Sequence, residues 1–165
     1  MIAPMTKDQI ATVLADHLAW FQGENGKRAN FDGALLYGAR FDGALLDGAR
    51  FDGASLDGAR FDGASLDGAS FFGARLDGAR FDGAKINDEK TAIGILRRAT
   101  RSDDQEFFLW HCQEGFFIKA DCRFLDMEAA RQHWTATRAG TPLGDETQDI
   151  LAMFAKAIKR RGAAQ

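Results

Sequence analysis

The 165-residue sequence contains only two cysteines, three histidines and one tyrosine. The two cysteines, Cys112 and Cys122, are too few for a disulfide framework, so we expect a reducing compartment. No stretch approaches the run of about 18 apolar residues that a membrane-spanning helix needs, and the N-terminus lacks the apolar run of a secretion signal. These absences predict a cytoplasmic protein without a membrane partner.

Strong charge of one sign is also missing, since the net charge is −3. The most acidic segment is 29–88, with ten Asp against six Arg or Lys. No segment is basic enough to suggest nucleic-acid binding. We therefore expect no direct nucleic-acid partner.

The sequence lacks the spacings that usually mark a catalytic or metal site. The candidate ligands His111, Cys112, Cys122 and His133 show neither a C-x-x-C nor an H-E-x-x-H pattern. Nothing places a base beside Cys112, and the repeated glycines never open a helix as a phosphate-binding loop does. The prediction is a non-enzymatic protein with no catalytic residue, metal or cofactor.

What the sequence does contain is a strict repeat from Ala29 to Asp88, in twelve five-residue units that begin ANFDG ALLYG ARFDG. Each unit opens with Ala and has Phe, Leu or Ile at its third place, and eleven close with Gly. On an α-helix a period of five rotates the apolar residue by about 140°, so no apolar stripe forms. On a single strand an odd period alternates the faces. A solenoid that bends once per unit is the remaining solution.

These units resemble the A-(D/N)-L-x-x units of pentapeptide-repeat proteins. The resemblance implies a mainly β fold, a right-handed quadrilateral β-helix with four units per coil and hence three coils. It also implies that the leading Ala and the central residue lie inside, while the other three places face solvent.

Stacking every fourth unit gives four columns of predicted core residues, and each column is chemically uniform. Uniform columns suit layered packing at interior density, which a disordered glycine-rich linker would have no reason to preserve. The columns are Phe31, Phe51 and Phe71; Leu36, Leu56 and Leu76; Phe41, Phe61 and Phe81; and Leu46, Leu66 and Ile86.

The outward places predict the surface. One wall should alternate Arg40, Arg60 and Arg80 with Asp42, Asp62 and Asp82, in exposed ion pairs worth about 0–1 kcal/mol each. Apolar residues at outward places, namely Leu35, Tyr37, Leu45 and Phe72, predict covering by the flanking segments or by a partner. The candidate interaction surface comprises this charged wall together with Tyr37 and Phe72.

The flanks predict two further parts. In 1–28, a helix from Thr6 to Phe21, with a Thr6/Gln9 capping box and a stop at Gly23, should cap the first coil. In 89–165 we expect a small α+β cap. It should contain a helix over 87–100 with Asp88 as N-cap, a hairpin of 106–112 and 116–122, and helices over 126–138 and 145–161.

Both flanks also resemble small stand-alone pentapeptide-repeat proteins of phages and prophages. The first functional hypothesis is thus a protein-interaction module. Its specific form would be a phage-encoded inhibitor or decoy that binds a host macromolecule in the host cytoplasm. The second is a DNA mimic acting on gyrase. Three coils form a column about 14 Å long. Duplex DNA of that length carries about eight phosphate charges, roughly twice the net negative charge of the repeats.

The third hypothesis is a structural or assembly component of a virion. An enzyme within the C-terminal cap has the least support. A homodimer through Phe72 or the aromatic hairpin is left open.

Overall fold

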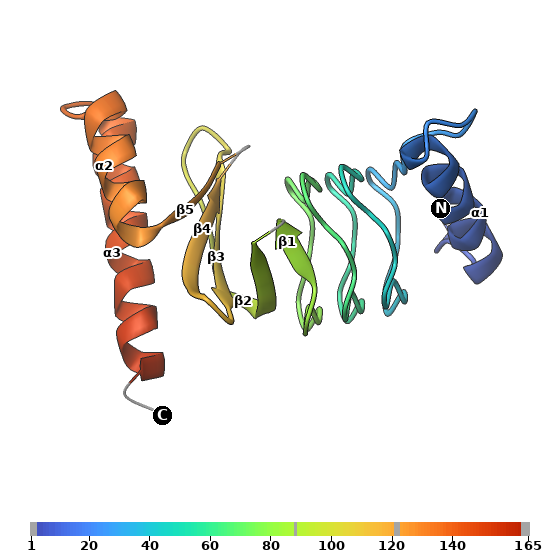
Figure 1. Ribbon diagram of the computed structural model, residues 1–165. Coiled ribbons are helices and arrows are strands. Elements are labelled where there is room, and N and C mark those ends of the chain that lie inside the picture. The colour runs from blue at the N-terminus through green and yellow to red at the C-terminus, as the bar shows by residue number, and fades with distance from the viewer. Residues whose placement is uncertain (1–2, 88, 121–122, 163–165) are drawn as a thin grey trace. The chain divides into compact units, whose positions relative to one another are not determined.

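The computed structural model describes residues 3–87, 89–120 and 123–162. The chain divides into two compact units, Met1–Ile93 and Gly94–Gln165. The first holds helix α1, the repeats and strand β1, and the second holds strands β3 to β5 and helices α2 and α3 (Figure 1). Strand β2 begins in the first unit and ends in the second.

Helix α1 spans Lys7–Phe21 and begins as predicted. The Thr6 side chain accepts a hydrogen bond from the Gln9 backbone N–H, and the Gln9 side chain accepts one from the Thr6 N–H, which completes the capping box. Gln22 is the C-cap and Gly23 follows with φ 77°, the left-handed conformation that ends many helices.

The repeats form a β-helix-like path in which each unit turns a corner through two residues (Figure 1). Parallel bridges join residues one circuit apart, such as Asn30 to Arg50 and Arg40 to Arg60. The Phe31 N–H donates to the Arg50 carbonyl at 2.8 Å, and the Arg50 N–H donates to the Ala29 carbonyl at 3.0 Å. Because bridged residues are 20 apart in sequence, four units complete one circuit.

The closing glycines make the corners possible. All eleven have φ between 61° and 72°, where a residue with a Cβ is strained. This explains why the fifth place of the unit hardly varies.

Inside the repeats, eleven of the twelve predicted core residues are buried and Leu76 is half-buried. Phe31, Phe51 and Phe71 stack with ring centroids 5.0 Å apart. The column of Phe41, Phe61 and Phe81 stacks at 4.9 Å and meets the first column edge to face. The two phenylalanine walls therefore interdigitate across the interior, in the geometry that aromatic rings prefer.

The helix predicted over 87–100 is wrong. Strands β1 (Lys85–Asn87) and β2 (Lys90–Thr100) form an antiparallel hairpin there, with Lys85 opposite Thr91. Lys85 also bridges Ser65 in the preceding circuit, so β1 pairs with the repeats on one side and with β2 on the other. An open edge of backbone groups and the alternating β-branched residues of β2 outweigh a short helix that would contain Gly94. The predicted N-cap, Asp88, lies outside the described residues.

The second unit contains the predicted hairpin. Strands β3 (Glu106–Cys112) and β4 (Gly115–Ala120) pair with Trp110 opposite Phe117. A further strand that the sequence analysis did not identify, β5 (Arg123–Asp126), pairs with β4. The hydrogen-bonded strand order is β1-β2-β3-β4-β5.

Two helices complete this unit. Helix α2 (Met127–Arg138) begins as predicted, with the Asp126 carboxylate accepting from the Ala129 N–H at 2.7 Å. Helix α3 (Pro142–Gly162) starts earlier than predicted, because Pro142 suits a first helical turn and Thr141 Oγ1 accepts from the Gly144 N–H. The buried side chains include Phe107, Leu109, Ile118, Trp134, Leu151 and Phe154. Among the helices described, none has the length and apolar character needed to span a bilayer.

Candidate functional site

The structure brings the six predicted wall charges together in one alternating ladder. Arg60 lies between two carboxylates, 3.2 Å from Asp42 and 3.1 Å from Asp62, and Arg80 lies 3.0 Å from Asp62 and 3.3 Å from Asp82. Arg40 contacts Asp42 at 2.9 Å. The hydrogen bond from Arg40 is the main cause that lowers the pKa of Asp42. Three cations and three anions therefore neutralise one another on this wall.

The aspartates also have a structural role that the sequence analysis did not identify. Asp32, Asp47, Asp52 and Asp62 each accept a hydrogen bond from the backbone N–H of the residue 20 further along. These N–H groups lie at corners, where the bridges do not satisfy them. The aspartates therefore hold successive circuits together, and their oxygens are not a freely available anionic array.

Two of the apolar exceptions are exposed, Tyr37 by 50% and Phe72 by 49%. Leu35 and Leu45 are half-buried. The N-terminal segment runs past Leu35, since the Met5 N–H donates to the Leu35 carbonyl at 3.1 Å. The protein's own flank thus contacts the backbone at Leu35, while Tyr37 and Phe72 remain exposed.

Tyr37 and Phe72 flank the same wall of the repeats. We call the three units centred on Leu36, Leu56 and Leu76 the Leu36 wall. The chain enters this wall through the corners at Asp32, Asp52 and Phe72, and leaves it through those at Tyr37, Asp57 and Asp77. One aromatic residue therefore lies at each border of the wall, Tyr37 in the first circuit and Phe72 two circuits later.

The charges of the Leu36 wall are less completely paired than those of the ladder. Arg75 lies 3.4 Å from Asp57 on this wall. At the entry corners, Asp32 and Asp52 lie 2.6 and 3.6 Å from Arg50 of the neighbouring wall. Asp77 is exposed and forms no ion pair with any described residue. The wall is thus acidic on balance, with an aromatic ring at each border.

Two of the candidate ligands, His111 and Cys112, lie at the end of β3. Cys112 is buried, and His111 stacks on Phe116 with ring centroids 4.8 Å apart. Cys122 lies outside the described residues. Within the described ranges no group of three or more His, Cys, Asp or Glu side chains is arranged to hold a metal ion.

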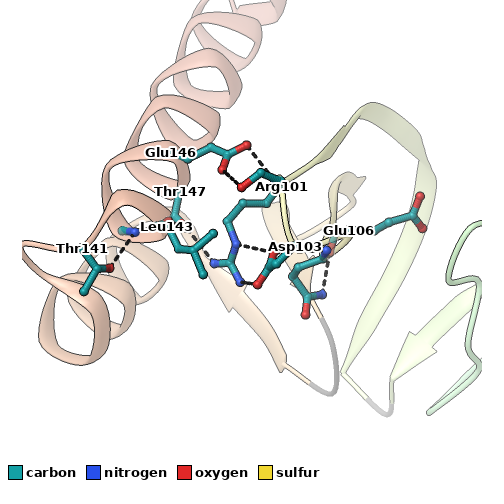
Figure 2. A network of polar contacts seen from close by, with 10 residues as sticks. Arg101, Asp103, Glu106, Thr141, Leu143, Glu146 and Thr147 are labelled. Atoms are coloured by element: carbon teal, nitrogen blue, oxygen red, sulfur yellow. Dashed lines mark hydrogen bonds and ion pairs between the residues drawn. The ribbon is translucent and has the colours of Figure 1, made fainter.

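The second unit contains a polar network that the sequence analysis missed, centred on Arg101 in the turn between β2 and β3 (Figure 2). Arg101 is only 3% exposed. Its Nε and Nη2 donate to the Asp103 carboxylate at 2.8 and 2.7 Å, and its Nη1 donates to Thr147 Oγ1 at 2.8 Å. The Arg101 guanidinium also lies over the Phe107 ring at 5.6 Å.

This network fixes the turn to the start of α3. Glu146 accepts from both the backbone N–H and the hydroxyl of Ser102. The hydrogen bond from Arg101 is the largest cause that lowers the pKa of Asp103, to about 2. The sequence carried no signal for this polar network, because Thr147 is 46 residues from Arg101.

Comparison with known proteins supports the repeat assignment. A family model described as Pentapeptide repeats (9 copies) matches residues 27–70. No curated protein sequence matches the chain.

Several solved structures are similar over part of the chain. A pentapeptide repeat protein from the cyanobacterium Cyanothece 51142 is 31% identical, over 37% of this chain and 42% of that one, with a TM-score of 0.36. HetL from the cyanobacterium Nostoc sp. strain PCC 7120, described as involved in heterocyst differentiation regulation, is 35% identical over 39% of this chain and 32% of its own, with a TM-score of 0.29. A protein from the Arabidopsis thaliana thylakoid lumen is 36% identical over 38% and 50%, with a TM-score of 0.17.

The chain thus spans half or less of the length of each of these structures. The assignment therefore rests on the strict five-residue units, their bridges one circuit apart, and the family model that matches them. On this evidence residues 27–70 of the chain are pentapeptide repeats.

Proposed function

We propose that this protein is a protein-binding module that acts through the Leu36 wall of its repeats. Pentapeptide-repeat proteins are in general interaction modules without catalytic activity. The observation that carries the proposal is the placement of Tyr37 and Phe72 at the two borders of one wall, each about half exposed. Aromatic side chains on a rigid lattice lose little entropy on binding and often dominate interface energies.

The charges of the wall indicate the chemistry of the partner. The three units of the wall hold two carboxylates and one cation: Arg75 lies 3.4 Å from Asp57, and Asp77 is exposed and forms no ion pair with a described residue. We therefore propose a partner protein that presents apolar side chains flanked by Lys or Arg. The phage-encoded inhibitor or decoy is the form of this proposal in which the partner is a host protein.

A DNA mimic has less support. Duplex DNA presents about one phosphate charge per 1.7 Å, whereas the aspartates of the ladder are each within ion-pair distance of an arginine. In a supercoiling assay with purified gyrase we expect no inhibition at tens of micromolar. Inhibition at that concentration would favour the mimic.

The decisive variants replace each aromatic residue with Asp, the residue found at the equivalent corner in the other two circuits. Phe72→Asp follows Asp32 and Asp52, and Tyr37→Asp follows Asp57 and Asp77, so the fold should persist. In a lysate of the source cells, we expect the wild type to form a crosslink to a partner protein and the double variant not to form it.

A photo-crosslinking residue at Ser55, on the Leu36 wall, should capture that protein. The matched control is the same residue at Ser65, in the same circuit on the opposite wall. Equal capture from both positions, or capture that survives the double variant, would contradict the proposal. Crosslinking to a second copy would identify a homodimer as the occupant, and a large homo-assembly would favour the virion component.

A further inference from the structure

A cavity of about 450 Å³ lies within the second unit, away from the repeats. Its lining comes from the turn after β2, the end of β4, the start of β5 and one side of α2. The basic residues in it are Arg101, Arg123, His133 and Arg138. Among the described residues that line it, none is a carboxylate.

Arg101 forms a fixed part of this lining. Three of its five N–H donors are used by Asp103 and Thr147, so the guanidinium is held in place and its charge is largely compensated. The cavity therefore has one rigid cationic border whose position does not depend on a ligand.

Arg123 and Arg138 are different, because neither forms an ion pair with a described residue. Both guanidiniums act on the same imidazole, since after burial they are the causes that lower the pKa of His133. Arg123 of β5 and Arg138 of α2 both line the cavity together with His133, so two arginines from different elements border one space. Two converging cations without a counter-charge repel each other unless an anion lies between them.

The rest of the lining suits a small anion with an organic part. The Trp134 ring supplies an apolar surface, whereas the Thr137 hydroxyl already donates to the His133 carbonyl at 2.9 Å. The cavity volume lies within the range of small-molecule sites. The planar fork of arginine matches phosphate oxygens in a bidentate way, which a lysine does not.

We propose that this cavity binds a small phosphate monoester, with Arg123 and Arg138 as the anion-binding residues and His133 in the same lining. The proposal is independent of the Leu36 wall, because no residue of the repeats lines the cavity. Small carboxylates share the charge but not the tetrahedral dianion, so they should bind more weakly.

The test is calorimetric titration of the whole protein with phenyl phosphate, inorganic phosphate and benzoate. We expect saturable binding of phenyl phosphate, weaker binding of inorganic phosphate, and little binding of benzoate. Arg123→Gln and Arg138→Gln should each weaken binding by about tenfold or more, as expected for loss of a charge-assisted hydrogen bond.

Arg131→Gln is the matched control, since Arg131 is on α2 but does not line the cavity. It should leave the affinity unchanged. As a second readout, bound phosphate should raise the pKa of His133 measured by NMR, because the anion offsets the two arginines. Absence of saturable binding at about 10 mM, or equal weakening by Arg131→Gln, would overturn the proposal.

Discussion

The backbone N–H of Ala29 donates a hydrogen bond to Nδ1 of His17 at 3.0 Å. Both residues are buried, so this bond ties α1 to the first repeat unit. It requires a neutral imidazole, because a proton on Nδ1 would remove the acceptor. Burial is the largest cause that lowers the pKa of His17, and Asp47 acts in the opposite direction.

The first prediction follows from this pKa. The unfolded chain, with a His pKa of about 6.5, binds the proton more tightly than the folded protein does. The contribution of His17 is therefore complete above that value and is lost as the pH falls through the lowered folded pKa. We expect the urea midpoint of the first unit to fall between about pH 8 and about pH 5.

His17→Gln should reduce that fall, since a glutamine oxygen can accept from Ala29 but does not titrate in this range. His133→Gln, in the second unit, is the control and should leave the fall unchanged. Undiminished pH dependence in His17→Gln would contradict the prediction.

The second prediction concerns a corner glycine. Gly58 has φ 68°, and a Cβ added there would meet no atom within 4 Å. Gly58→Ala should therefore cost about 1–2 kcal/mol through backbone strain alone. Gly94→Ala, also in open space but without a positive φ, should be neutral or slightly stabilising. Denaturant unfolding measures both, and equal effects would remove the strain explanation.

The third prediction separates interior from surface phenylalanines. Phe61 is fully buried and stacks on Phe41 and Phe81 at 4.9 Å, whereas Phe72 is 49% exposed. Phe61→Ala should lower the free energy of unfolding by about 3–5 kcal/mol. Phe72→Ala should change it by less than about 0.5 kcal/mol. A large loss with Phe72→Ala would mean that Phe72 packs inside the fold.

The fourth prediction concerns the acid stability of the second unit. The pKa of Asp103 falls from its ordinary 3.8 to about 2 because Arg101 donates to its carboxylate. The lowered folded pKa means that the stabilisation is present above about 3.8 and is lost as the pH falls through about 2.

We expect Asp103→Asn to reduce stability at neutral pH and to flatten the acid transition of this unit, followed by circular dichroism. The neighbouring Asp104 is exposed and forms no ion pair with a described residue, so Asp104→Asn is the control. If both variants keep the wild-type transition, the ion pair does not contribute.

The sequence predicted those features that depend on local or periodic chemistry. The capping box of Thr6 and Gln9, the N-cap at Asp126 and the hairpin of β3 and β4 are all confirmed. Each depends on residues within a few positions of one another, or on simple alternation. The missed strand β5 is four residues long, too short for a clear pattern.

The error over 87–100 has a different origin. The expected helix was inferred from a short apolar pattern in isolation, whereas the structure offers that segment an unpaired edge at Lys85. An edge of backbone donors and acceptors is a property of the assembled repeats, so no local reading of the sequence includes it.

By itself, the sequence determined the repeating path, because a period of five with Gly at each corner leaves the chain one regular way to bury its Phe and Leu residues. Only the tertiary structure decided which residues meet across that path and in the second unit. It placed Tyr37 and Phe72 at the borders of one wall, directed aspartates to backbone N–H groups one circuit away, and brought Arg123, His133 and Arg138 into the lining of one cavity. The physical reason is that these relationships join residues far apart in sequence, and their distances exist only once the chain has folded.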